Sequence, residues 1–193
     1  MEMFKAPQDA LMFAYRFSEQ QYALSPMGKL MKGSIGSGKG LVALEGAGQA
    51  GFILEGVSRL GDVEQACITC RYSLRFEPCQ CRRYCCNGET ILVEYQNALM
   101  MIDRLVALPV VGDSAMAHHH KLRHHIIRHY FERRDKARHI ESIGKIAERL
   151  KVPKRTAYDL KGKIEKALID IDKTAMTKID AILEKMCGEQ DKN

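Results

Sequence analysis

Six of the seven cysteines lie within twenty residues, in the stretch CITCRYSLRFEPCQCRRYCC from 67 to 86. Thiolate sulfurs bind zinc tetrahedrally, and four of them complete the coordination of a structural ion. The first residues do not have the pattern of an export signal, so we expect these thiols in a reducing cytoplasm. Clustered cysteines bind metal there more often than they form disulfides. We therefore predict one structural zinc ion and a cytoplasmic location.

The cluster offers more thiols than one tetrahedral ion needs. Four cysteines share a single loop, and we predict that they form a compact zinc knuckle: Cys79, Cys81, Cys85 and Cys86. The competing set combines Cys67 and Cys70, which lie three residues apart on one helical face, with two of those four. Reduced structural thiols without a metal are the remaining alternative. No oriented histidine or acidic partner indicates a catalytic cysteine, and we predict that the protein is not an enzyme.

The second group with a chemical role lies at 143–160, in the stretch IGKIAERLKVPKRTAYDL. A helix-turn-helix needs a small residue where its two helices cross, and Ala147 occupies that position. It also needs an apolar pair on the inner face of the second helix, which Ala157 and Leu160 supply. Lys151 stands where such turns usually carry glycine, so we expect a strained or alternative turn geometry there.

The outward positions of the second helix are predicted to contact DNA: Lys154, Arg155, Thr156, Tyr158 and Lys161. Lys and Arg can donate to guanine edges or phosphates, while Thr and Tyr can reach phosphates or thymine methyl groups. Residues 121–163 contain fourteen basic and five acidic residues, a net charge of +9, so the rest of this +6 chain carries −3. The concentrated charge favours a polyanionic partner. The alternative is an amphipathic helical hairpin with a solvated basic face.

The stretch 115–168 resembles region 4 of bacterial sigma factors. The resemblance is carried by IRHY at 127–130, by IAERL at 146–150 and by a recognition helix over 154–168. Free-standing modules of this kind occur in phage and prophage late-gene regulators, including Q-like antitermination proteins and related activators. The resemblance implies a sequence-specific regulator of double-stranded DNA that works through RNA polymerase. No segment resembles the promoter-melting or core-clamping parts of a complete sigma factor.

These groups must be positioned by helices, because no segment shows sustained period-two alternation. Helical spacing is predicted over 8–23, 41–60, 62–76, 89–107, 115–134, 141–150 and 154–187. The glycines within 41–60 lower helix propensity and indicate a segment packed close to a neighbour. Breaks at Pro109 and Gly112 set the domain boundary. We predict an all-α protein, with a helical domain at 1–112 that carries the cysteine loop 67–88, and a helix-turn-helix domain at 113–193.

The long C-terminal helix carries an apolar stripe at spacings of three and four residues. Its members are Ile164, Leu168, Ile171, Ala175, Ile179, Ile182 and Met186. Such a stripe must be covered. The N-terminal domain or a second copy of the chain can cover it, and the sequence leaves both open.

Two further motifs, a glycine-rich stretch and a group of histidines, do not indicate a catalytic site. The glycine-rich stretch 33–40 lacks the Ser or Thr that a P-loop needs after Lys39. The histidines between 118 and 129 lie among basic residues without an HExxH arrangement, which favours a solvated or phosphate-facing helix.

No apolar stretch is long enough to span a membrane. The alternatives to a polymerase-linked regulator are a dimeric helix-turn-helix repressor and a phage DNA-packaging or replication adaptor.

Overall fold

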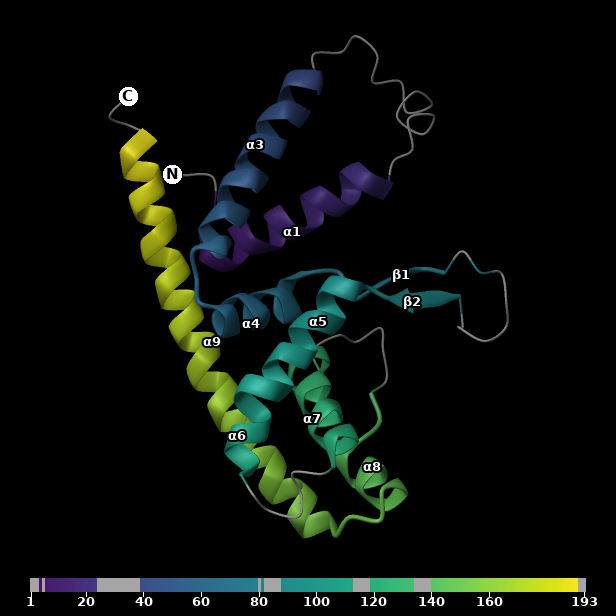
Figure 1. The fold of residues 1–193 in the computed structure, drawn as a ribbon. Helices are drawn as coiled ribbons and strands as arrows, with labels where there is room; N and C mark the ends of the chain where they lie inside the picture. Colours follow the sequence, from purple (N-terminus) through teal and green to yellow (C-terminus); the bar gives the residue numbers. More distant parts are fainter. Residues whose placement is uncertain are drawn as a thin grey trace. The chain divides into compact units, whose positions relative to one another are not determined.

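The computed structural model describes residues 4, 6–23, 39–79, 81, 88–112, 119–133 and 140–190. Most of these residues lie in helices, in agreement with the predicted all-α class, although a two-stranded hairpin interrupts them (Figure 1). The elements are α1 (Pro7–Ala23), α3 (Lys39–Ser58), α4 (Asp62–Tyr72), β1 (Phe76–Pro78), β2 (Glu89–Ile91), α5 (Val93–Ile102), the π-helical turn η2 (Asp103–Ala107), α6 (Leu108–Val111), α7 (His120–Glu132), α8 (Ile143–Arg149) and α9 (Lys154–Gln190). Among the described helices, none combines the length and apolar character that crossing a membrane requires.

The described residues form two compact units. The first contains those of 1–60, 72–74 and 176–190, and the second contains those of 61–71 and 75–175. The bounds of these units differ from the predicted domains 1–112 and 113–193. Helix α9 contributes its first part to the second unit and its last part to the first.

In the first unit, α3 packs closely against two neighbouring helices. A Cβ on Gly46 would lie 2.7 Å from the Phe17 ring of α1. A Cβ on Gly56 would lie 3.3 Å from a methyl group of Leu183 in α9. Only glycine allows the first of these approaches without displacing its neighbour. The prediction that this glycine-bearing segment packs close to a neighbour is confirmed.

Four positions of the apolar stripe of α9 are buried within the chain, while Ile171 and Ile182 are half-buried. Ile164 and Leu168 are fully buried in the core of the second unit. Ile179 is fully buried in the first unit, where its Cδ1 would lie 3.5 Å from a Cβ on Gly56. Of the two alternatives for this stripe, packing on the chain's own helices accounts for these positions. Met186 lies outside the side chains that the structure describes.

One core joins α4, α5, α7, α8 and the first part of α9 in the second unit. The largest fully buried side chains in this core are Tyr95, Leu99, Ile102, Leu122, Ile126, Ile127, Ile164 and Leu168. Helices α7, α8 and α9 therefore do not form a free-standing module, because α5 and α4 supply part of the same core.

The helix that starts at α5 continues through Pro109 to Val111, although the sequence predicts a break at this proline. The π-helical turn η2 lies directly before α6, which contains Pro109, and the Leu108 N–H donates to the Asp103 carbonyl five residues back. In a regular α-helix a proline ring clashes with the carbonyl four residues back, and a π turn changes that local geometry. The helix ends at Gly112, whose φ of +62° suits glycine.

Candidate nucleic-acid interface and metal centre

Helix α8 begins at a side-chain cap. Ser142 has extended backbone geometry, with φ −65° and ψ 151°, and its Oγ accepts a hydrogen bond from the Lys145 N–H at 3.4 Å. A serine in this position satisfies one of the amide groups that a helix start leaves without a partner. The helix then runs for seven residues and ends at Arg149.

The turn after α8 closes with two backbone hydrogen bonds. The Lys151 N–H donates to the Glu148 carbonyl at 3.0 Å, and the Val152 N–H donates to the Ala147 carbonyl at 2.9 Å. This pair of bonds is the Schellman arrangement, which requires a left-handed residue just after the helix. Lys151 has φ +57° and supplies it. The expected strained geometry at Lys151 is confirmed.

Replacing Lys151 by Gly should therefore stabilise the protein. Glycine adopts positive φ without the steric cost that an L-residue carries, so we expect the free energy of unfolding to rise by up to about 1 kcal/mol. Lys151→Val should lower it by roughly 1–2 kcal/mol, because a β-branched side chain opposes this conformation. Urea unfolding with an unchanged slope measures both effects.

Lys151→Ala is the matched control for this pair, because it removes the charged side chain and keeps the backbone cost. It should leave stability nearly unchanged. A destabilising Lys151→Gly, or a neutral Lys151→Val, would show that the turn does not depend on the left-handed residue.

The inner face of the two helices is apolar and closely packed. Ala147 of α8 and Ala157 of α9 are fully buried, and Leu160 is 5% exposed. Val152 in the turn is buried as well. Small side chains at 147 and 157 let the two backbones approach, while Val152 and Leu160 fill the space on either side. These burials agree with the inner positions that the sequence predicts.

The predicted DNA-contacting residues occupy the first two turns of α9. Lys154, Arg155 and Tyr158 are exposed, with Tyr158 at 51%, and Thr156 and Lys161 are half-buried. Lys154 Nζ lies 2.5 Å from Glu148 Oε1, and Lys161 Nζ lies 3.8 Å from Glu165 Oε2. The hydrogen bond from Lys154 lowers the pKa of Glu148.

Arg155 and Tyr158 differ from those two lysines. Among the described residues, no carboxylate forms an ion pair with Arg155. The Tyr158 hydroxyl lies beside α8, 3.5 Å from where a Cβ on Gly144 would stand. Within the part of the chain that the structure describes, Arg155 is therefore the predicted contact residue whose charge no carboxylate neutralises.

Buried charges fix α7, on which α8 and α9 pack. Arg123 is 4% exposed and donates from Nε and from a terminal nitrogen to Asp103 of η2, at 2.8 and 3.0 Å. Glu132 is 1% exposed and accepts from the Tyr95 hydroxyl at 2.5 Å and from Arg128 at 2.8 and 3.0 Å. Two-pronged charge-assisted hydrogen bonds of this kind fix geometry as well as charge.

These anchoring residues are not among the functional residues predicted from the sequence. A signal was present for Arg123, because it lies on the apolar stripe of α7, one position after Leu122 and four before Ile127. A charged residue inside such a stripe indicates a buried partner. Nothing local identified Asp103 as that partner.

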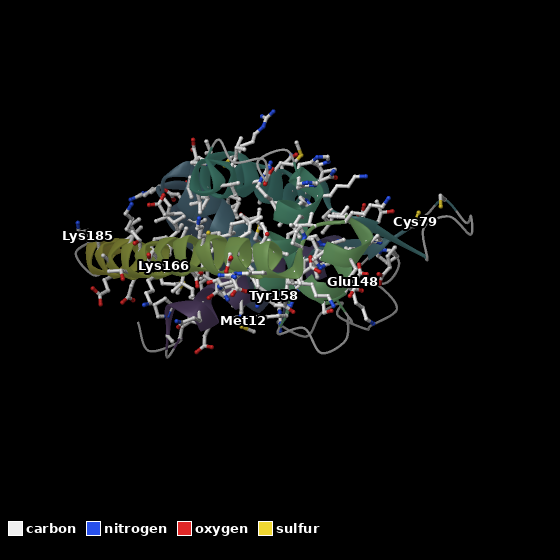
Figure 2. The ribbon with its side chains drawn as sticks, turned by 90° about the horizontal axis from the view of Figure 1, so that it is seen from below. Met12, Cys79, Glu148, Tyr158, Lys166 and Lys185 are labelled. Atoms are coloured by element: carbon white, nitrogen blue, oxygen red, sulfur yellow. The ribbon has the colours of Figure 1, made fainter. Side chains whose placement is uncertain are left out.

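The cysteine loop is closed by a short antiparallel hairpin. Strands β1 and β2 pair Phe76 with Ile91 and Pro78 with Glu89. The Cys79 N–H donates to the Gly88 carbonyl at 2.8 Å, which brings the two ends of the loop together. Figure 2 shows Cys79 at the far end of this hairpin.

Two of the four predicted zinc ligands are described, and they lie together. The Cys81 N–H donates to the Cys79 Sγ at 3.4 Å, and Cys81 is exposed. A backbone donor to sulfur favours the thiolate form that a metal requires. Cys85 and Cys86 lie outside the described residues. Within the described part of the chain, no cluster of three or more His, Cys, Asp or Glu residues is placed to hold a metal ion.

Cys67 and Cys70, the competing pair, have a different environment. Both lie on α4 and are fully buried in the core of the second unit. Burial raises the pKa of the Cys67 thiol to about 12, and burial also raises the pKa of Cys70. Metal binding requires the thiolate, and these thiols are harder to ionise than ordinary cysteines.

Comparisons with family models, with curated proteins and with solved structures find no match to this chain.

Proposed function

We propose that the protein is a sequence-specific double-stranded DNA-binding regulator of transcription that uses the start of α9 as its recognition helix. The observation that carries this proposal is the arrangement of α8, its left-handed turn at Lys151 and α9. That arrangement buries Ala147 and Ala157 between the helices and leaves Arg155 exposed, with no carboxylate partner among the described residues. A helix held at a fixed angle by such a turn can enter the major groove.

The residues of α9 would divide the work of recognition. Arg155 would donate to the O6 and N7 atoms of guanine, the commonest specific contact in the major groove. Thr156 and Tyr158 would contact phosphate or a thymine methyl group. Lys154 and Lys161 would exchange Glu148 and Glu165 for phosphates, so their contribution to affinity is smaller than their charge suggests.

We also propose that specificity comes from a second partner, RNA polymerase, as the resemblance to sigma region 4 implies. One recognition helix contacts few base pairs, and a local charge of +9 gives affinity with little sequence choice. Phage or prophage antitermination, or late-gene activation, is the corresponding role. The rest of the chain carries −3 and is suited to a protein partner rather than to DNA.

The hairpin loop would hold one structural zinc ion in this proposal, through Cys79, Cys81, Cys85 and Cys86. Four thiolates leave no open coordination position, so the ion would fix the loop and take no part in chemistry. The hydrogen bond from the Cys81 N–H to the Cys79 Sγ supports the choice of this loop.

Selection of bound duplexes from a random library, followed by affinity measurement, tests the proposal. Arg155→Ala should weaken binding to the selected site by roughly 1–3 kcal/mol and relax the preference at one base pair. Wild-type affinity should fall with salt, with a logarithmic slope of about −0.9 for each phosphate contact. Lys185→Ala is the matched control, because Lys185 is an exposed cation at the other end of α9.

Absence of duplex binding in low salt would contradict the proposal. An equal loss in Arg155→Ala on every sequence would reduce Arg155 to a phosphate contact. Co-purification with RNA polymerase supports the polymerase-linked role. A stable dimer whose footprint shows half-sites about 34 Å apart, without polymerase, would favour the dimeric repressor.

A further inference from the structure

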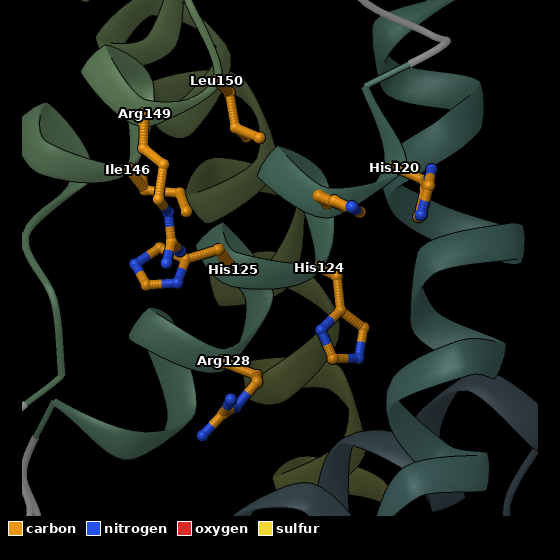
Figure 3. Close-up of a pocket in the computed structure, with 8 residues that line it drawn as sticks. His120, His124, His125, Arg128, Ile146, Arg149 and Leu150 are labelled. Carbon is orange, nitrogen blue, oxygen red and sulfur yellow. The ribbon is translucent and has the colours of Figure 1, made fainter.

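A pocket of about 760 Å³ opens between α7 and α8 in the second unit (Figure 3). Its lining residues are mostly basic or imidazole side chains: His120, Lys121, His124, His125, Arg128, Ile146, Arg149 and Leu150. Among the described residues, the lining contains no carboxylate, although Glu132 and Glu141 pair with Arg128 and Arg149 from outside it. Lys121 has no carboxylate partner in the described part of the chain, and the guanidinium N–H groups that face the pocket can still donate, so this concave site is suited to an anion.

Three of these side chains are held in place by partners that do not themselves line the pocket. Arg128 donates to Glu132, at 2.8 Å from Nε. A terminal nitrogen of Arg149 lies 3.0 Å from Glu141 Oε2, and His125 Nε2 lies 2.8 Å from the Glu141 carbonyl oxygen. Side chains fixed in advance lose less conformational entropy when a ligand binds.

The remaining polar side chains are available to a ligand. Within the described residues, His120, Lys121 and His124 have no hydrogen-bond partner. Burial and the neighbouring Arg128 lower the pKa of His124, while Asp103 and Glu132 oppose that change and His125 adds to it. The His124 imidazole is therefore harder to protonate than an ordinary histidine, and a bound anion would favour its protonated form.

We propose that this pocket binds a phosphate group, through Lys121, His124 and the guanidinium groups of Arg128 and Arg149. Phosphate carries up to two charges near pH 7 and several acceptor oxygens, which match a set of guanidinium, ammonium and imidazole donors. The phosphate comes either from a DNA backbone or from a free phosphorylated ligand. Phosphate binding by this pocket does not require the proposed function, because a free phosphorylated ligand would engage the same donors as a DNA backbone.

The test uses the full-length protein with inorganic phosphate and pyrophosphate as ligands, and it follows the His124 signals by NMR. Both ligands should shift these signals saturably and raise the pKa of His124. Lys121→Gln/Arg149→Gln should weaken binding by about tenfold or more. Lys145→Gln/Lys163→Gln is the matched control, because both lysines are exposed and neither lines the pocket; it should bind as the wild type does.

Measuring duplex affinity for the same variants distinguishes the two sources. For a backbone phosphate, Lys121→Gln/Arg149→Gln lowers the salt slope by about one contact, and pyrophosphate competes with DNA. For a free ligand, the variant loses pyrophosphate binding and keeps its DNA slope. Phosphate binding without any duplex binding would support the pocket and contradict the proposed function. The pocket proposal is overturned if phosphate gives no saturable shift of His124, or if Lys121→Gln/Arg149→Gln binds like the control.

Discussion

Purified protein should contain about one zinc ion per chain, and the Cys79→Ser/Cys81→Ser variant should contain almost none. Structural zinc sites bind with roughly 10–16 kcal/mol of apparent free energy, and removal of two of four thiolates removes most of it. We replace Cys79 and Cys81 among the four predicted ligands because the structure describes both, and the Cys81 N–H donates a hydrogen bond to the Cys79 Sγ. Zinc content after gel filtration in reducing buffer measures the effect.

Two variants serve as controls for the zinc experiment. Cys187→Ser removes a thiol from the last turns of α9 and should retain the metal. Cys67→Ala/Cys70→Ala should retain the metal too, although cavities in the core will lower its stability. Full zinc in Cys79→Ser/Cys81→Ser, together with its loss in Cys67→Ala/Cys70→Ala, would reassign the site to the buried pair with Cys85 and Cys86.

Much of the helical core could be predicted from residue types and spacing alone. Ala147, Ala157 and Leu160 are buried as the helix-turn-helix pattern requires, and Lys151 adopts the positive φ that its replacement of glycine implies. These features depend on contacts close in sequence, within one or two helical turns. Local patterns determine them, so a single sequence reveals them.

Other features depend on interactions that local patterns do not contain. Strands β1 and β2 have three residues each, which is too few to show a period-two pattern in the sequence. The sequence therefore predicts helical spacing from residue 89, whereas residues 89–91 form a strand of the hairpin. The helix continues past Pro109 because a π turn precedes it. The pairing of Arg123 with Asp103 joins positions twenty residues apart, and no spacing rule connects them.

Replacing Glu132 by Ala should lower the free energy of unfolding by about 3–5 kcal/mol, the usual cost of breaking a buried ion pair from one side. Glu132 is 1% exposed and is the common acceptor for Arg128 on its own helix and for Tyr95 on α5. Its loss leaves a fully buried hydroxyl without an acceptor and a guanidinium without its charge partner. Unfolding in urea measures the change.

The pH dependence of stability separates the charge of Glu132 from its size. Burial alone would raise the pKa of Glu132, but hydrogen bonds from Arg128 and Tyr95 outweigh it and lower the pKa below its ordinary value of 4.5. A carboxyl with a lowered pKa stabilises the folded state fully above its unfolded pKa. That contribution is lost as the pH falls below 4.5 and through the lowered value.

Glu132→Gln keeps the shape of the side chain and removes this proton linkage. Its stability should be reduced at pH 7 and should change less between pH 5 and acid conditions than that of the wild type. Tyr95→Phe keeps the ion pair and loses one hydrogen bond, so it should cost only about 1–2 kcal/mol. An acid dependence in Glu132→Gln as steep as in the wild type would place the linkage on other carboxylates. A small loss in Glu132→Ala would mean that α7, which packs against α8 and lines the pocket between them, is held by its apolar core alone.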